Sequence, residues 1–201
     1  MDESLKSINQ LTDDEKNIVK NILNEFASKG KSDELKNLYL EDYEEIPVDL
    51  MTFLCDDQYL GNYTNHGKDI YDTWKKELSY VHSPTTFCDQ WAITGSTGTG
   101  KSTVGTYSIC YELYKLMCLK NPNRFYLGAD ETIWILFFNL NLKLAERTMW
   151  GKFQKALQKS PWFMERGTVT GRTNLVYQPN KDIKLGIGST EEHALSLAVF
   201  I

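Results

Sequence analysis

The segment that decides the fold of this 201-residue chain reads Gly95-Ser96-Thr97-Gly98-Thr99-Gly100-Lys101-Ser102. It fits the pattern G-x-x-x-x-G-K-[ST] at every position. Glycines let successive backbone N–H groups turn inward around an anion because no Cβ obstructs them, and the helix that follows adds its positive N-terminal end. The pattern therefore predicts a loop that holds the phosphates of a nucleoside triphosphate.

The side chains after the last glycine predict how the triphosphate is held. Lys101 is the predicted catalytic residue, because its ammonium can extend to the β- and γ-phosphates. The hydroxyl of Ser102 is placed to coordinate Mg²⁺, and that of Thr103 to donate to the α-phosphate. The predicted cofactors are ATP and Mg²⁺, and the predicted contacts are Gly95, Ser96, Thr97, Gly98, Thr99, Gly100, Lys101, Ser102 and Thr103. The structural alternative is a flexible glycine loop with a solvated lysine.

The segments around this loop alternate between strand and helix patterns. Residues 87–94 (FCDQWAIT) predict a strand that runs into the loop, and residues 101–119 predict the helix that follows it. Residues 133–140 are rich in branched and aromatic side chains, which favours a central parallel strand buried on both faces. Further along, the patterns predict a helix at 142–158 that ends before Ser160-Pro161, strands at 173–178 and 182–187 around a turn at Pro179-Asn180, and another strand starting at 197–201. This order predicts an α/β sheet.

The amino-terminal part of the chain has a different character and predicts a separate domain. Residues 1–60 carry a net charge of −9, against +1 for 61–120 and +3 for 121–201. Apolar side chains recur at helical spacing between Ile18 and Phe26, so residues 1–45 predict an acidic helical appendage. Ile46-Pro47 interrupts this pattern, because a residue before proline is pushed away from helical dihedral angles. We therefore expect an ATPase domain over 46–201, which begins with a short helix at 48–59.

Composition narrows the class of protein. With 41% hydrophobic, 24% charged and 12% aromatic residues, the chain is typical of a globular protein and unlike a disordered or collagen-like one. Its longest apolar run, residues 133–138, is far shorter than the roughly 20 residues that a membrane-spanning helix needs. The four cysteines include no C-x-x-C pair, which argues against a zinc cluster. The acidic start lacks a signal-peptide pattern, so we expect a cytosolic protein with no membrane partner.

ATP hydrolysis also needs an acidic residue at the end of a strand, which holds Mg²⁺ and polarises the attacking water. None of the acidic residues after Lys101 ends a run of four apolar strand residues. Residues 197–201 (LAVFI) are such a run, and the sequence stops with it. We expect the acidic residues to follow Ile201, and this chain by itself to hydrolyse ATP weakly or not at all.

Weaker sequence features follow one another in the order found in a known family. They are FLCDDQYLG at 53–61, IYDTWKKEL at 70–78, Asn121-Pro122, Ser160-Pro161-Trp162-Phe163, Gly188-Ser189 and His193-Ala194-Leu195. Together with the phosphate-binding loop, they make residues 48–201 resemble the ATPase domain of the large terminase subunit of tailed bacteriophages, the motor that pumps DNA into procapsids. The resemblance implies a P-loop NTPase fold of the additional-strand type, with a mostly parallel sheet flanked by helices.

The resemblance also implies partners and a setting. Terminase motors act as homo-oligomeric rings on double-stranded DNA, with a portal and a small terminase subunit. They work in the cytoplasm of the infected bacterial host and transiently at the procapsid. In that family an Asp-Glu pair ends the hydrolysis strand and a nuclease domain follows it. Neither the pair nor the nuclease carboxylates are present in this sequence, so nuclease activity cannot be assigned.

One position departs from the family pattern. Many terminases carry an arginine within the loop, where it stabilises charge in the transition state, and this chain has Thr97 there. Another cation would have to replace it. The sequence offers four arginines after the loop without a way to choose among them: Arg124, Arg147, Arg166 and Arg172.

Two other functions fit the same loop. A different P-loop ATPase, such as a helicase, would take its acidic residue from another position. A nucleotide-binding assembly module would dock a partner through the acidic appendage, without catalysis.

Recognition of the base is open as well. Tyr71 and Trp74 fall on one face of a predicted helix, where one ring could stack on adenine or both could pack in the core. Gln58 and Gln90 are candidates for reading the adenine edge. Gly188-Ser189 with His193 is a candidate sensor of the bound nucleotide or, alternatively, a structural turn.

Overall fold

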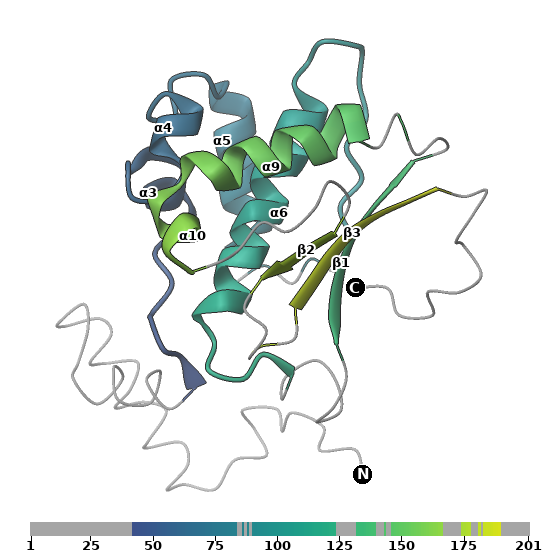
Figure 1. Ribbon diagram of the computed structural model, residues 1–201. Coiled ribbons are helices and arrows are strands. Elements are labelled where there is room, and N and C mark those ends of the chain that lie inside the picture. Colours follow the sequence, from purple (N-terminus) through teal and green to yellow (C-terminus); the bar gives the residue numbers. More distant parts are fainter. Residues whose placement is uncertain are drawn as a thin grey trace, which may run out of the picture. The chain divides into compact units, whose positions relative to one another are not determined.

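The computed structural model describes residues 42–83, 86, 88, 90–123, 132–139, 143, 146–166, 174–177, 181 and 183–189 (Figure 1). The chain forms two units, Met1–Ile46 and Pro47–Ile201, and the elements named below belong to the second. The helices predicted before residue 42 and the strand predicted at 197–201 lie outside the described residues. None of the described helices combines the length and the apolar character that crossing a membrane requires.

The described elements of the second unit alternate between short helices, one long helix and three strands. In chain order they are α3 (Leu50–Cys55), α4 (Gly61–Thr64), α5 (Asp72–Val81), α6 (Lys101–Cys118), β1 (Ile133–Asn139), the π-helix η2 (Glu146–Trp150), α9 (Gly151–Lys159), α10 (Pro161–Arg166), β2 (Asn174–Tyr177) and β3 (Ile183–Ser189). Figure 1 shows α6 in the middle of this unit, with α3, α4 and α5 on one side and the strands on the other.

Helix α6 confirms the helix predicted at 101–119 and forms the centre of the core. The side chains that it buries point to more than one side, as expected of a helix enclosed by its neighbours. They are Val104, Thr106, Tyr107, Cys110, Tyr111, Leu113, Tyr114, Met117 and Cys118.

An aromatic cluster joins α6 to helices that precede and follow it. The ring of Phe53 in α3 is fully buried and stacks on Tyr114 of α6, with ring centroids 4.9 Å apart. Trp162 of α10 meets Tyr114 edge-on at 4.7 Å. Stacked and edge-on contacts both suit the charge distribution of aromatic rings. The hydroxyl of Tyr111 donates to the Val48 carbonyl, and that of Tyr114 accepts from the Val48 N–H, so the cluster also fixes the segment that leads into α3.

Helix α3 is shorter than the helix predicted at 48–59. The predicted end at residue 59 was wrong, because α3 ends at Cys55. It begins at a cap, because the Asp49 carboxylate accepts hydrogen bonds from the N–H groups of Met51 and Thr52 and from the Thr52 hydroxyl. The Thr52 hydroxyl bond, outweighing the effect of burial, lowers the pKa of Asp49. The helix ends at Cys55, since the Asp56 carboxylate accepts from the Gln58 N–H at 2.8 Å and turns the chain.

The described strands form one sheet in the order β1-β3-β2. Strands β1 and β3 are parallel, with Ile133 opposite Ile183, and β2 runs antiparallel to β3. Parallel neighbours need a crossover connection, which here includes α9 and α10. The strands predicted at 133–140, 173–178 and 182–187 are thereby confirmed.

Two predictions about the strands were wrong. Strand β1 is not buried along its whole length: Ile133 and Phe137 are buried, but residues 134–136 are partly exposed. The described residues of the strand predicted at 87–94, which are 88 and 90–94, form no strand. Asp89 and Gln90 interrupt the apolar run, and residues 90–94 are exposed or half-buried. The segment therefore lacks the continuous apolar surface that a central parallel strand requires.

The helix predicted at 142–158 is interrupted by a π turn. Residue 143 is helical, the π-helix η2 covers Glu146–Trp150, and α-helical geometry resumes at Gly151. The helix α9 ends at Lys159, which confirms the end predicted before Ser160-Pro161. Trp150 and Phe153 anchor this region, with ring centroids 5.4 and 5.0 Å from that of Phe137 in β1. Single π turns within helices are frequently found at functional sites.

A buried lysine closes the carboxyl end of α6. Lys181 is 4% exposed, and its Nζ donates to the carbonyl oxygens of Met117 at 2.6 Å and Leu119 at 2.5 Å. The last carbonyls of a helix lack partners within the helix, and a cation there also suits the helix dipole. Lys181 therefore holds the strand region and the end of α6 together.

We predict that Lys181→Met lowers the free energy of unfolding by about 2 kcal/mol, because methionine fills the space but leaves two buried carbonyls without their donor. Urea unfolding of the purified protein measures the change. Lys155→Met, which removes the same charge from an exposed position of α9, should change stability by less than about 0.5 kcal/mol. Equal stability of the Lys181 variant and the wild type would contradict this role.

Candidate nucleotide-binding site

The predicted phosphate-binding loop has a backbone that depends on its glycines. Gly95, Gly98 and Gly100 have φ angles of 137°, 90° and 85°, in a region that other residues rarely adopt. Gly100 is also the residue that caps α6, so the loop leads directly into the amino-terminal end of an 18-residue helix. The free N–H groups and the dipole at such an end favour an anion.

Lys101 folds back over this loop. Its Nζ donates to the carbonyl oxygens of Gly95, at 2.7 Å, and Ser96. The hydroxyl of Thr99 donates to the same Ser96 carbonyl at 3.0 Å. The ammonium therefore stands inside the curve of the loop, where two neutral carbonyls are its partners and where a phosphate would be a stronger acceptor.

The next two residues lie where the sequence places them, in the first turn of α6. Ser102 is half-buried, and its hydroxyl fits a magnesium site, since Mg²⁺ prefers oxygen ligands and takes most of the others from phosphates and water. Thr103 is tied to another element: the Nζ of Lys152 in α9 donates to its hydroxyl oxygen at 2.9 Å. Lys152 lies 49 residues further along the chain, and no sequence motif singles it out.

A cavity of about 400 Å³ opens beside the loop. Its walls come from the loop, from the first two turns of α6 and from the segment that enters α5. The lining residues are Lys68, Asp69, Ile70, Tyr71, Trp74, Gly98, Gly100, Thr103, Val104 and Tyr107. Burial raises the pKa of Tyr107 to about 12, so its phenol stays protonated near neutral pH. The volume is within the range of small-molecule sites.

The structure brings both predicted aromatic residues to this cavity, and it gives one of them a further contact. The indole Nε1 of Trp74 donates to the Thr99 carbonyl at 2.8 Å, which fastens the loop to α5. Tyr71 stands just before α5 and is 67% exposed. Among the described residues that line the cavity, neither Gln58 nor Gln90 occurs.

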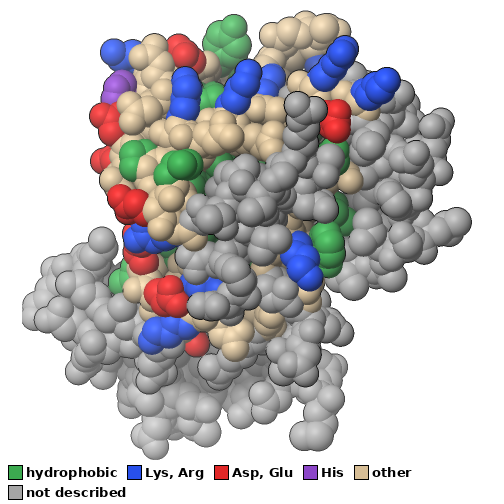
Figure 2. All heavy atoms as spheres, in the orientation of Figure 1, with side chains coloured by type: hydrophobic (Ala, Val, Ile, Leu, Met, Phe, Trp, Pro, Cys, Tyr) green, Lys and Arg blue, Asp and Glu red, His purple; other side chains and the backbone are tan. Residues whose placement is uncertain are grey.

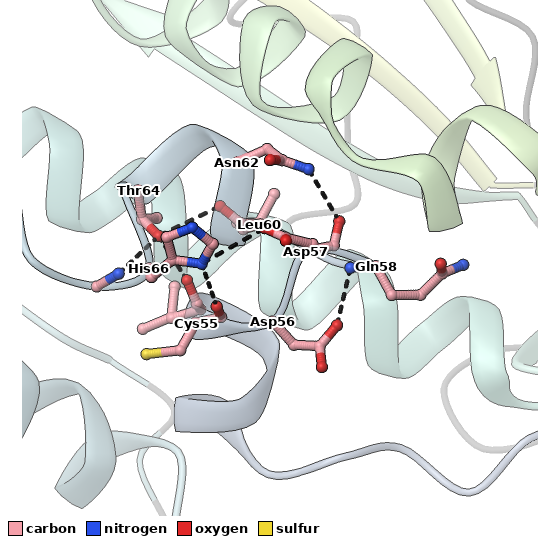
Figure 3. A network of polar contacts seen from close by, with 10 residues as sticks. Cys55, Asp56, Asp57, Gln58, Leu60, Asn62, Thr64 and His66 are labelled. Carbon is pink, nitrogen blue, oxygen red and sulfur yellow. Dashed lines mark hydrogen bonds and ion pairs between the residues drawn. The ribbon is translucent and has the colours of Figure 1, made fainter.

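A network of polar contacts that includes Thr64 and His66 (Figure 3) precedes the cavity wall at residues 68–71. The buried Thr64 hydroxyl donates to the Leu54 carbonyl at 2.5 Å and accepts from the Gly67 N–H at 3.1 Å. His66 contacts the Cys55 carbonyl through Nδ1 at 3.2 Å. Asn65, His66 and Gly67 all have positive φ angles, a costly sequence that these bonds hold in place. The chain therefore reverses sharply just before the cavity wall.

Helix α5, which carries Trp74, is fixed to α6 at its other end. His82 lies between two α6 side chains, with Nε2 2.8 Å from the Ser108 hydroxyl and Nδ1 2.8 Å from the Glu112 carboxylate. Burial alone would raise the pKa of Glu112, but the hydrogen bond from His82 and the charge of Lys115 outweigh it and lower the pKa. The position of Trp74 is thus determined from both ends of α5.

The other candidates from the sequence lie elsewhere. Arg147 is exposed in η2, and the guanidinium of Arg166 lies 4.5 Å from the Trp162 ring centroid. Arg124, Arg172 and His193 lie outside the described residues. Gly188-Ser189 ends β3, opposite the end of β1.

Comparison with known proteins identifies the family. The family described as "Uncharacterized protein MJ0330, N-terminal P-loop domain" matches residues 8–187, and the chain belongs to it. The match supports the P-loop part of the expected fold. Its description names neither a terminase nor an activity, so the match gives no support to the terminase identity suggested by the sequence. No curated protein and no solved structure matches the chain.

We predict that Trp74→Phe loosens the phosphate-binding loop, because phenylalanine keeps an aromatic ring but cannot donate to the Thr99 carbonyl. Limited digestion with trypsin, followed by mass spectrometry, should show cleavage after Lys101 about fivefold faster than in the wild type, as expected for the loss of one hydrogen bond worth about 1 kcal/mol. Tyr71→Phe alters an exposed neighbour and should leave the rate unchanged. An unaltered rate in the Trp74 variant would show that the bond does not hold the loop.

Proposed function

We propose that this member of the MJ0330 P-loop family binds a nucleoside triphosphate, ATP, with Mg²⁺ in the loop at 95–102. The observation that carries the proposal is the position of the Lys101 ammonium inside a loop of left-handed glycines at the start of α6. A phosphate entering the loop would meet backbone N–H groups, a helix dipole and this ammonium together. Lys101 would then exchange its two carbonyl partners for the β- and γ-phosphates.

The remaining contacts of the loop follow from its first helical turn. The Ser102 hydroxyl would be a ligand of Mg²⁺, and the Thr103 hydroxyl would donate to the α-phosphate. Ser96, Thr97 and Thr99 would contribute mainly through their backbone N–H groups, since Ser96 and Thr97 are exposed and the Thr99 hydroxyl already donates to the Ser96 carbonyl. These assignments account for every position of the motif and add only Thr103, the next residue of α6.

The base would occupy the cavity that adjoins the loop. Tyr71 and Trp74 supply aromatic surface there, and Asp69 and Lys68 supply hydrogen-bonding groups at its edge. Trp74 is held by its Nε1–H, so its ring is fixed before a ligand arrives. A fixed ring loses little freedom on binding, which favours affinity.

We further propose that this protein hydrolyses the bound ATP. Phosphoryl transfer requires an acidic group beside the metal and the attacking water. The described strands β1, β2 and β3 contain no Asp or Glu. Hydrolysis by the described part of the chain alone should therefore be slow, and a binding measurement is the sharper test.

The proposal predicts that Lys101→Ala weakens binding of a fluorescent ATP analogue at least tenfold, because the charge-assisted contacts to two phosphates are lost. Titration in the presence of Mg²⁺ measures the affinity, and chelating Mg²⁺ should weaken wild-type binding as well. Lys76→Ala, which removes a charge from the exposed face of α5, is the matched control. ATP should compete better than inorganic tripolyphosphate if the cavity holds the base. Equal affinities of wild type and Lys101→Ala would refute the proposal.

A narrower proposal concerns the use of the ATP. We propose that hydrolysis moves double-stranded DNA into procapsids, in a ring of subunits that works with a portal and a small terminase subunit in the host cytoplasm. The ordered sequence features between Phe53 and Leu195 support this proposal, and the family description leaves it open.

The narrower proposal predicts micromolar binding of duplex DNA that requires ATP and is lost in Lys101→Ala. Fluorescence anisotropy of a labelled duplex at about 0.1 M salt measures it, because electrostatic binding to DNA depends strongly on salt. ATP binding without any DNA binding would contradict the motor function and leave the nucleotide site intact. The assembly-module alternative would then be the function to test.

A further inference from the structure

Helix α9 brings a second lysine to the phosphate-binding loop. We propose that Lys152 is a phosphate-binding cation of this site, directed at the α-phosphate of the nucleotide. The inference rests on the proposed nucleotide function and adds to it a residue outside the motif. Its basis is the 2.9 Å bond from the Lys152 Nζ to the Thr103 hydroxyl oxygen, in the first turn of α6.

The chemistry of this bond leaves Thr103 ready for an anion. An ammonium can only donate hydrogen bonds, whereas a hydroxyl has one proton to donate and two lone pairs that accept. Lys152 therefore occupies a lone pair of Thr103, and the hydroxyl proton is directed away from the ammonium. A phosphate oxygen that accepts this proton would lie close to the charge of Lys152, and the attraction between them is strong where water is partly excluded.

The packing of α9 explains why Lys152 reaches that far. Gly105 of α6 has no side chain, and a Cβ there would lie 3.2 Å from the Met149 Cε in η2, so the glycine permits the close approach of the two elements. Phe153, the next residue after Lys152, is fully buried against Phe137. These contacts fix the rotation of α9 and turn Lys152 toward α6.

The other lysines of α9 have different surroundings. Lys155 is exposed, and Lys159 lies over the ring of Tyr63 with its Nζ 5.8 Å from the centroid. Figure 2 shows Lys and Arg side chains gathered over the α9 region at the surface. Lys152 is half-buried instead, and its ammonium is used in a contact between two helices. Lys155 therefore offers a control with the same charge on the same helix.

The experiment compares Lys152→Met with Lys155→Met by titration with fluorescent ATP and ADP and by competition with unlabelled adenosine. We expect Lys152→Met to weaken the binding of ATP and of ADP by a similar factor of about ten, because both nucleotides carry the α-phosphate. The affinity for adenosine, measured by competition, should stay unchanged. Lys155→Met should bind ATP and ADP like the wild type. Lys152→Arg should restore most of the affinity, since it restores the charge.

A second variant separates charge from structure. Lys152→Gln keeps a polar donor on a slightly shorter side chain but is neutral, so it should show the same loss as Lys152→Met, even if the methionine variant folds poorly. Wild-type affinity in the glutamine variant would overturn the inference, and so would a loss confined to ATP or a loss shared by adenosine. If the wild type itself binds no nucleotide, the proposed function fails and the inference fails with it. If Lys101→Ala loses nucleotide binding and the Lys152 variants keep it, the inference about Lys152 fails and the proposed function stands.

Discussion

The left-handed backbone at Gly98 and Gly100 is the constraint on which the candidate site depends. It turns the chain so that α6 begins at Lys101 and so that the lysine side chain can bend back to the Gly95 carbonyl. A residue with a Cβ at either glycine would be strained in this conformation. The backbone of the loop thus defines the site. It also sets where α6 begins, and this start places the side chains of Ser102 and Thr103.

Helix α6 links the site to the stability of the protein. Its first turn carries the phosphate-binding residues, Tyr107 lines the cavity, and Tyr114 lies in the aromatic cluster. Its last carbonyls accept bonds from the buried Lys181. Helices α5 and α9 touch the loop region from two sides, through Trp74 and Lys152. Residues that no short motif contains therefore determine how the loop is held.

The features that the sequence predicted well are local ones. The glycine-rich loop and its helix follow from the residue types at eight consecutive positions, and strands β1 and β3 follow from short segments in which apolar residues recur. The segment at 87–94 was wrongly predicted as a strand, because a few apolar residues beside Asp89 and Gln90 suit an extended chain without supplying a surface to bury. Strand formation depends on partners, which a single segment does not specify.

The features that the sequence could not predict depend on tertiary contacts. Trp74 was recognised as a candidate beside the nucleotide, but its bond to Thr99 requires α5 to lie against the loop. Lys152 was missed because its direction depends on the π turn before α9, which shifts the phase of every later residue in the helix. The four arginines after the loop were the candidates to replace the loop arginine of terminases, whereas the cation that contacts Thr103 is Lys152.

A crystal structure of the protein with Mg²⁺ and a non-hydrolysable ATP analogue tests the central claim most directly. The account predicts phosphates within the curve of Gly95 to Ser102, with the Lys101 Nζ moved from the Gly95 and Ser96 carbonyls to a phosphate oxygen. A loop without phosphate at saturating nucleotide, with Lys101 still bonded to those carbonyls, would contradict it.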